Sequence, residues 1–161
     1  MKPTDLPASL QGIALRHLFV LEVKVDGLQG ISGSPDVKRR VGPIGSGRFH
    51  GQRLAGHVLP GGSDWQTVTD DGATYLDARV VLETDAGEAI GMTFGGVRRG
   101  PAEVMTRLAK GEPVDPAEYY FRIHAAFSTG APALGWLNQT IAVGTGHRLP
   151  TGPVYNLFEV L

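Results

Sequence analysis

Apolar and polar residues alternate along several short runs of the chain, a pattern that predicts half-buried β-strands. The clearest run covers residues 73–84. Because successive side chains of a strand point to opposite sides, one face of this run is wholly apolar, with Leu76, Ala78, Val80 and Leu82. The turn sequence DAG separates it from a second run at residues 88–97, so the two runs predict a β-hairpin.

Further strands are predicted on both sides of this hairpin. They cover residues 16–26 and 118–128, one or two bent strands within residues 48–59, a strand that begins near Asp64, and two strands at the end of the chain. Residues 132–137 are expected to form a turn or a single helical turn. Trp136, Asn138 and Thr140 are expected to share one face of the strand that begins there.

Two stretches depart from the strand pattern. One helix is predicted at residues 101–110, where a proline suits the first turn and Gly111 ends the segment. Residues 27–47 are rich in glycine and show no alternation, which predicts a long functional loop or a lid.

Eight or nine short strands joined mostly by short connections predict an all-β fold. Sequential strands with short links pair antiparallel, and this number of strands closes best as a single barrel. A flattened β-sandwich is the alternative. We expect one domain over residues 1–161, with one short helix near residues 101–110 and a loosely ordered arm at residues 1–13.

Composition fits this fold class and narrows the function. The 161 residues include 23 glycines and 11 prolines, which leaves little room for long helices. The 15 Lys and Arg residues nearly balance the 16 Asp and Glu residues, which argues against nucleic acid as the main partner. Cysteine is absent, which excludes disulfides and thiolate chemistry. No apolar run approaches the ~18 residues of a membrane span and no signal peptide is evident, so we expect a cytoplasmic protein without a membrane partner.

Three short segments stand out by their order and spacing: the PGG-x-DW turn at residues 60–65, YFR at residues 120–122 and WLN at residues 136–138. With them, nearly the whole chain from residue 14 to residue 161 resembles the domain-of-unknown-function family numbered 3237. The resemblance implies an all-β barrel of lipocalin-like shape, often oligomeric, with no settled biochemical role. It implies no established catalytic residues.

Two predicted strands place polar and aromatic side chains opposite their apolar face. In residues 73–84 and 118–128 these side chains are Tyr75, Asp77, Arg79, Tyr120, Arg122 and His124. One interpretation is that the apolar faces fill the core and the polar faces meet water. The other is that the polar faces line a barrel lumen that holds one small ligand, since Tyr and Arg are typical of binding sites.

The second interpretation assigns catalytic roles to several residues. Arg79 and Arg122 would hold a carboxylate or polarise a carbonyl oxygen through their forked N–H groups. Tyr120 and His124 are candidate acids or bases. Asp77 is a candidate for substrate binding, or it pairs with Arg79 as a structural ion pair.

Asp64 is the candidate general base. A pocket against the indole of Trp65 would raise the pKa of its carboxyl group. The alternative is that Asp64 binds backbone amides, because an aspartate after Gly-Gly-Ser often does so in a turn. The candidates for substrate binding are Trp65, Tyr75, Asp77, Trp136 and Asn138.

Other kinds of site find little support in the sequence. The five histidines are His17, His50, His57, His124 and His147. Their spacing matches no metal-binding motif, so we expect no metal. The glycine-rich residues 42–47 lack the following Lys and helix of a P-loop, so we expect no nucleotide cofactor. Lys38, Arg39 and Arg40 are interpreted as a solvated loop, or as a loop that closes over an anionic ligand.

Three functions remain open. The first is a cofactor-independent enzyme of isomerase, cyclase or lyase type that moves a proton on an aromatic or polycyclic carbonyl compound. The second is a lipocalin-like carrier or sensor of small hydrophobic ligands. The third is a structural barrel filled by its own side chains. Because the apolar C-terminal strand VYNLFEVL needs a covered edge or face, we also expect a homo-oligomer, a dimer or a tetramer.

Overall fold

The computed structural model describes residues 2–34 and 37–161. Its strands are β1 (Leu15–Val25), β2 (Gln29–Ser34), β3 (Val37–His50), β4 (Ala55–Val58), β5 (Gly62–Thr69), β6 (Thr74–Thr84), β7 (Ala89–Arg99), β8 (Tyr120–Ser128), β9 (Ile141–Leu149) and β10 (Gly152–Val160). Its helical segments are α1 (Ala102–Ala109) and the 3₁₀ turns η1 (Pro3–Asp5), η2 (Ala8–Leu10), η3 (Pro116–Glu118) and η4 (Pro132–Gln139).

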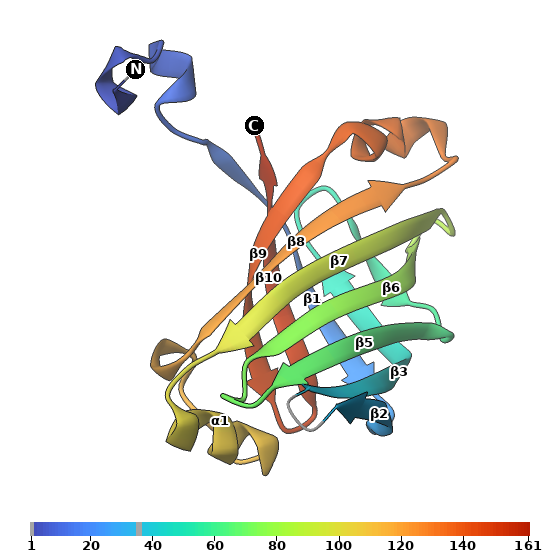
Figure 1. The fold of residues 1–161 in the computed structure, drawn as a ribbon. Helices are drawn as coiled ribbons and strands as arrows, with labels where there is room; N and C mark the ends of the chain where they lie inside the picture. Colours follow the sequence, from blue (N-terminus) through green and yellow to red (C-terminus); the bar gives the residue numbers. More distant parts are fainter. Residues whose placement is uncertain (1, 35–36) are drawn as a thin grey trace.

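Eight of these strands close into an antiparallel barrel (Figure 1). The order around the barrel is β1, β10, β9, β8, β7, β6, β5 and β3, and β3 pairs with β1 to complete the circle. The other two strands are additional: β2 pairs with β3, and β4 bridges β3 and β6. The predicted barrel is confirmed. The sandwich alternative is wrong because the sheet closes on itself.

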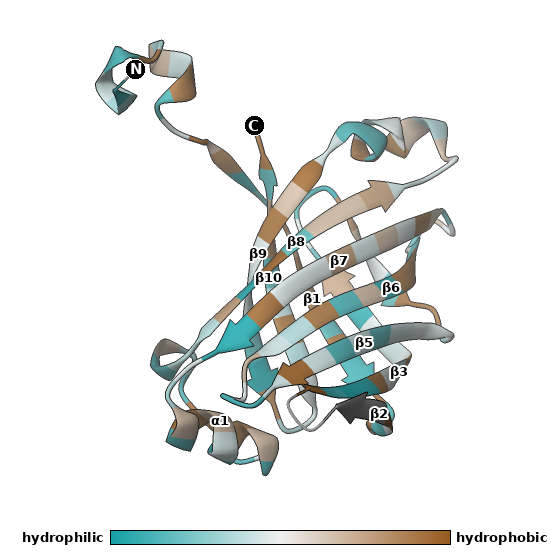
Figure 2. Ribbon diagram, in the orientation of Figure 1, coloured by the Kyte–Doolittle hydropathy of each residue, from teal (hydrophilic) through white to brown (hydrophobic). Residues whose placement is uncertain are grey.

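Apolar side chains fill most of the barrel interior. Every second residue of β6 is buried, and Ala78 and Leu82 have no exposed surface. The rings of Phe94 and Phe121 pack edge-on against Tyr155, with centroids 5.4 and 5.5 Å from its centroid. Figure 2 shows hydrophobic and hydrophilic residues interspersed along the strands, as two-faced strands require. An eight-stranded barrel is just wide enough to be filled by its own side chains or to hold one small ligand.

The long loop predicted at residues 27–47 is wrong. Most of this stretch is strand β2 and the first part of β3, and its residues 35 and 36 lie outside the described part of the chain. The glycines that suggested turns allow strands to approach closely instead. A Cβ atom on Gly47, for example, would lie 2.3 Å from the carbonyl oxygen of Glu22 on β1. Lys38 and Arg39 are exposed on β3, whereas Arg40 is half-buried.

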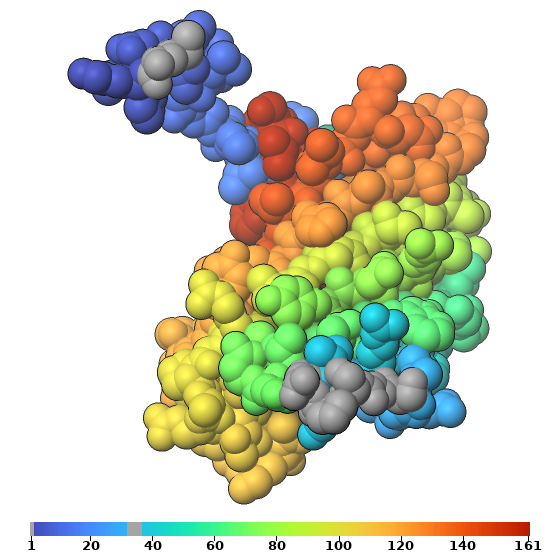
Figure 3. All heavy atoms as spheres, in the orientation of Figure 1, coloured from blue at the N-terminus to red at the C-terminus, as the bar shows by residue number. Residues whose placement is uncertain are grey.

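Helical segments lie at opposite ends of the barrel (Figure 1). The predicted helix is confirmed as α1, which follows β7 and buries Val104, Met105 and Leu108. The turn η4 connects β8 to β9 at the other end, with a proline at its start. Residues 2–14 contain no buried residue and project away from the barrel (Figure 3). The α1 end is therefore the end at which further side chains could enclose a site.

Candidate functional site

The polar faces of β6 and β8 lie on the outside of the barrel. All six candidates on these faces are exposed: Tyr75, Asp77, Arg79, Tyr120, Arg122 and His124. The hypothesis that these faces line the lumen is therefore wrong. The apolar faces take the interior because burying aliphatic and aromatic side chains removes the most apolar surface from water.

These exposed residues still come together across neighbouring strands. Tyr75 lies opposite Val97, and Val97 lies opposite Arg122. An open outer groove of about 780 Å³ includes Tyr75, Tyr120, Arg122 and His124 in its lining. An adjoining hollow of about 440 Å³ includes Asp77, Arg79 and His124. Because water reaches all of these polar groups and competes for their interactions, this face is a weak candidate for catalysis.

The three remaining candidates for substrate binding do not line the cavity that contains Asp64, and the predicted pocket of Asp64 against the Trp65 indole is wrong because the two side chains lie on opposite faces of β5. Trp65 is 54% exposed on the outer face of β5. Trp136 and Asn138 lie on the turn η4, so the strand face predicted for them is wrong. Trp136 packs against the guanidinium of Arg53 at 4.2 Å. The Asn138 side chain binds the backbone N–H and C=O of Thr129 at 2.7 and 3.0 Å, which fixes the η4 connection.

Asp64 is the one predicted site residue that points into the barrel. It is 5% exposed and lies within β5, opposite Ala78 of β6. The predicted strand that begins near Asp64 is confirmed as β5, and the alternative that Asp64 binds backbone amides in a turn is wrong because Asp64 lies within the strand. Gln66 lies two positions further along β5 and shares the inward face.

Three arginines share the α1 end of the interior with Asp64. Arg40 of β3, Arg98 of β7 and Arg148 of β9 line a cavity of about 40 Å³ together with Asp64. The rest of the lining is Val25, Leu28, Gln66, Leu76, Phe121, Pro153 and Tyr155. A water molecule needs roughly 10–15 Å³ of such space, so this inner cavity holds about three atoms of that size.

Hydrogen bonds account for only some of the polar atoms around the inner cavity. Arg40 Nε donates to Gln66 Oε1 at 2.8 Å, and Gln66 Nε2 donates to Asp64 Oδ2 at 2.5 Å. Within the described residues, no ion pair joins Asp64 to an arginine. Asp64 Oδ1 and Arg98 Nε are buried without a hydrogen-bond partner. Buried polar atoms are nearly always bonded in folded proteins, so two exceptions in one cavity call for a partner such as water, an ion or a ligand.

Burial also shifts the pKa values in this cluster. Loss of hydration raises the pKa of Asp64. The Gln66 hydrogen bond, the charges of Arg98 and Arg40, and the backbone of Asp77 oppose this only in part. Loss of hydration lowers the pKa of Arg98 to about 10, and the charges of Arg148 and Arg40 act in the same direction. Burial raises the pKa of Tyr155 as well. A carboxyl group that holds its proton more readily than in water suits a general acid or base.

A second cavity adjoins the first beneath α1. This vestibule has a volume of about 220 Å³ and shares Arg40 and Arg98 with the inner cavity. The rest of its lining is Val68, Asp70, Asp71, Gly72, Thr74, Ala102, Met105, Thr106 and Ala109. Arg40 and Arg98 therefore separate the vestibule from Asp64.

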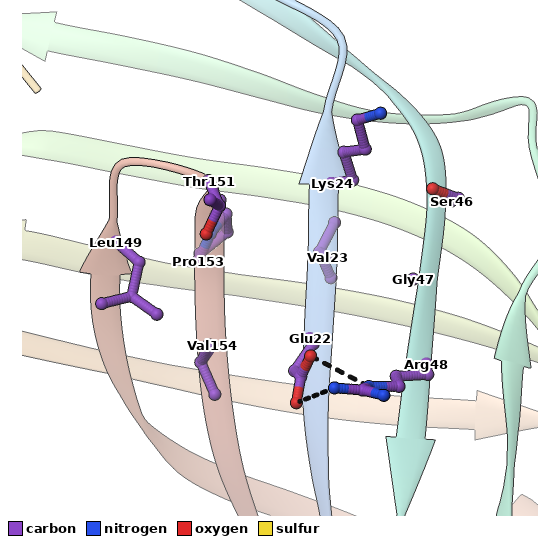
Figure 4. Close-up of a pocket in the computed structure, with 11 residues that line it drawn as sticks. Glu22, Val23, Lys24, Ser46, Gly47, Arg48, Leu149, Thr151, Pro153 and Val154 are labelled. Atoms are coloured by element: carbon purple, nitrogen blue, oxygen red, sulfur yellow. Dashed lines mark hydrogen bonds and ion pairs between the residues drawn. The ribbon is translucent and has the colours of Figure 1, made fainter.

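A further groove on the outer surface, of about 660 Å³, runs along β10, β1 and β3 (Figure 4). Its Glu22 and Arg48 bind each other, with Arg48 Nε 3.0 Å from Glu22 Oε2 and Arg48 Nη2 3.3 Å from Glu22 Oε1. Both side chains are exposed, with 48% and 75% of their surface accessible. This groove lacks the buried, unpartnered groups that mark the inner cavity.

Comparison with known proteins identifies the family. Residues 13–160 match the family described as protein of unknown function (DUF3237). The chain belongs to this family. A protein of unknown function from Rhodopseudomonas palustris is 33% identical, and its crystal structure matches with a TM-score of 0.87 over 93% of this chain and 98% of that one. A β-barrel-like protein from Acinetobacter baumannii is 38% identical, with a TM-score of 0.82 over 98% and 99%.

A more distant structure shares the DUF3237 barrel. It is an enzyme from Penicillium herquei, 19% identical, with a TM-score of 0.70 over 92% of this chain and 95% of that one. At this level of identity the likeness shows the fold alone.

The described part of this DUF3237 protein contains neither a cluster of metal ligands nor a membrane-spanning helix. Among residues 2–34 and 37–161, no three His, Cys, Asp or Glu side chains are grouped so that they could hold a metal ion. In the same part of the chain, no helix has the length and apolar character needed to span a bilayer.

Sequence reasoning missed most of the interior cluster of this DUF3237 barrel. Gln66 could have been found by stepping two positions along the strand from Asp64. Arg98 shares the inward face of Met92 and Phe94, but the predicted strand ended one residue before it. Arg148 gives no local signal, because only closure of the barrel brings its strand to the others.

Proposed function

We propose that the α1 end of the barrel binds a small carbonyl compound and that Asp64 moves a proton on it without a cofactor. One observation carries this proposal: the Asp64 carboxyl group is 5% exposed, lines a cavity and has one oxygen without a hydrogen-bond partner. Carboxyl groups with pKa values raised by burial are typical of general acids and bases.

The proposed reaction begins at a carbon next to the carbonyl group of the ligand. The Asp64 carboxylate removes a proton from it, so a C–H bond breaks, an O–H bond forms on Asp64, and the electron pair moves to the carbonyl oxygen. The Arg98 guanidinium would stabilise the resulting enolate oxygen. Return of the proton from Asp64 to a different carbon completes an isomerisation. Attack of the enolate carbon on a second carbonyl carbon of the same ligand forms a C–C bond, and the second carbonyl oxygen takes the proton from Asp64, which completes a cyclisation. In a lyase reaction the bond from the neighbouring carbon to a leaving group breaks, and the leaving group takes the electron pair and the proton from Asp64. Gln66 holds Oδ2 of Asp64, which leaves Oδ1 as the reacting oxygen.

The relatives support a catalytic use of the fold only at a distance. The Penicillium herquei protein is called an enzyme, whereas the Rhodopseudomonas palustris protein is described as having unknown function. A carrier would use the same cavities without proton transfer. The inner cavity of about 40 Å³ favours a third candidate, a structural barrel that binds nothing.

Proton exchange tests the proposal. The protein is incubated in heavy water with aryl alkyl ketones and aryl β-diketones, and the loss of the α-proton signal is followed by proton NMR. We expect exchange above the buffer rate, and a decrease of roughly 100-fold or more in Asp64→Asn. Asp85→Asn, at an exposed turn, is the matched control.

Three outcomes would contradict the proposal. Exchange that persists in Asp64→Asn removes Asp64 from the reaction. Exchange lost instead in His124→Gln moves the chemistry to the outer groove. Binding of these compounds without exchange favours a carrier.

A further inference from the structure

The α1 end of the barrel interior contains more positive than negative charge. Three guanidinium groups, those of Arg40, Arg98 and Arg148, line the inner cavity with one carboxyl group, that of Asp64. They come from three separate strands, so the surplus arises only when the barrel closes. Removing a charge from water is costly, and buried charges in proteins are normally paired. A surplus of arginines at a cavity therefore suits an anion that a ligand supplies.

The acceptors that the protein itself offers to these arginines are neutral. Arg40 Nε donates to the amide oxygen of Gln66 at 2.8 Å. Arg98 Nη2 donates to the hydroxyl group of Thr74 over a long distance of 3.5 Å. Arg98 Nε has no hydrogen-bond partner, even though the residue is buried and only 8% exposed to water. The side-chain hydrogen bond of Arg98 is thus to a neutral group, and Arg98 has N–H capacity left over.

The two cavities limit the size of the ligand. The inner cavity of about 40 Å³ matches a carboxylate, whose heavy atoms are each close to a water molecule in size. The vestibule of about 220 Å³ has apolar walls from Val68, Met105 and Ala109. Together they stay below the roughly 300–1,000 Å³ of pockets for drug-sized ligands. The space suits one ring rather than several.

Acidic groups of the vestibule direct an anion inward. Asp70 and Asp71 both line it. The carboxylate of Asp71 is already bound, with Oδ1 accepting from Thr69 Oγ1 at 2.6 Å and from the backbone N–H of Ala73 at 3.1 Å. A carboxylate in the vestibule would meet these like charges, whereas deeper in the barrel it meets guanidinium groups.

We infer, building on the binding site proposed above, that its ligand is a carboxylate with a single aromatic or alicyclic ring. The carboxylate enters the inner cavity among Arg40, Arg98 and Arg148, and the ring lies in the vestibule beneath α1. Arg98, which lines both cavities, donates its unpartnered N–H to the carboxylate. A carbonyl group close to the carboxylate would then bring the two proposals together in one compound, an aryl-substituted oxo acid.

Benzoate and its neutral isostere benzamide test this inference. Titration calorimetry at constant ionic strength gives the Kd of each compound. We expect benzoate to bind at least roughly tenfold more tightly than benzamide, because charge-assisted hydrogen bonds to arginine are the strong ones. Arg98→Met should raise the Kd of benzoate roughly tenfold or more. Arg99→Met, which removes the same charge at the neighbouring exposed position, should leave the Kd within about twofold.

Two further variants keep the test independent of one substitution. If Arg98→Met lacks a native melting transition, Arg148→Met takes its place. Asp64→Asn should strengthen benzoate binding, because it removes the carboxylate that lines the inner cavity beside the bound anion. Equal affinities for benzoate and benzamide, no benzoate binding at millimolar concentration, or equal losses in Arg98→Met and Arg99→Met would overturn the inference.

Failure of this inference is distinguishable from failure of the proposed reaction. Benzoate binding that requires Arg98, without proton exchange on any carbonyl compound, leaves the anion site standing and removes the reaction. Proton exchange that requires Asp64, with benzoate and benzamide bound alike, leaves the reaction and removes the anion site.

Discussion

Replacing Arg98 by Met should stabilise the unliganded protein. Arg98 is 8% exposed, and loss of hydration together with the charges of Arg148 and Arg40 lowers its pKa from its ordinary value to about 10. A difference of one pKa unit between the folded and unfolded states corresponds to about 1.4 kcal/mol. The pKa of Arg98 falls by more than two units, so the folded state disfavours the charged guanidinium by ~3 kcal/mol at neutral pH. Methionine removes the charge and is flexible enough to fill the same space.

Two lost contacts reduce this gain. Arg98 Nη2 donates to Thr74 Oγ1 at 3.5 Å, and the guanidinium lies 5.5 Å from the ring centroid of Phe121. The long hydrogen bond and the cation–π contact each contribute a net ~0.5–1 kcal/mol, which leaves an expected increase of ~2 kcal/mol in the free energy of unfolding. For a domain of this size that corresponds to roughly 4–8 °C in Tm.

Urea unfolding followed by tryptophan fluorescence and melting followed by circular dichroism measure this change. Arg99→Met is the matched control and should shift the free energy of unfolding by less than about 0.5 kcal/mol, because Arg99 is exposed. A loss of ~2 kcal/mol or more in Arg98→Met alone would show that the guanidinium holds the barrel end together. The interpretation of Arg98 as a ligand-binding group would then be wrong. A variant that is more stable and binds benzoate less well is the expected signature of a functional site.

Three further predictions concern charge and assembly. Because burial raises the folded pKa of Asp64 above its ordinary value of 3.8, the folded state binds that proton more tightly, and stability falls as pH rises from 3.8 through the raised folded pKa. In urea unfolding at a series of pH values, Asp64→Asn should become progressively more stable than the natural protein across this range, and a constant difference would contradict the sign. Glu159, 4% exposed, behaves oppositely, since hydrogen bonds from Arg16 and Arg53 and their charges lower its pKa. The contribution of the Glu159 carboxylate to the free energy of unfolding is complete above pH 4.5 and is lost as pH falls through the lowered folded pKa. In urea unfolding, Glu159→Gln should therefore lower the free energy of unfolding by ~1–2 kcal/mol at neutral pH and by little in acid. Finally, large apolar side chains are exposed on the outer surface, including Leu15, Tyr75, Val81 and Ile141. Sedimentation at micromolar concentration should therefore show a dimer or a tetramer, and a monomer alone would contradict this prediction.

Local alternation predicts the strands of this protein well. Residues 73–84 and 88–97 form the expected hairpin as β6 and β7, and the helix near residues 101–110 is α1. Short connections between such strands led directly to the antiparallel barrel. The loop predicted at residues 27–47 was wrong because glycine occurs both in turns and in closely packed strands, and the sequence does not distinguish these two uses.

Alternation defines two faces of a strand without saying which of them points inward. The aromatic and charged face of β6 and β8 resembled a binding site, yet it lies outside because the opposite face carries the larger apolar surface. The interior cluster was missed for a different reason. Arg40, Asp64, Arg98 and Arg148 lie on four strands that are distant in sequence, and only barrel closure brings them together.

Closure of the barrel has a consequence for how the chain folds. Strand β1 pairs with β3, which follows soon after it, and also with β10, so that Leu15 lies opposite Val160. Contacts between residues so distant in sequence form slowly, because the entropy of closing the intervening chain is lost first. On the ribosome the last strand to be made is therefore the one that closes the ring, and until then β1 and β9 each keep an open edge that another chain could pair with. The arginine-rich interior loses its water only at that final step, so the late, rate-limiting part of folding is expected to be the part that creates the site.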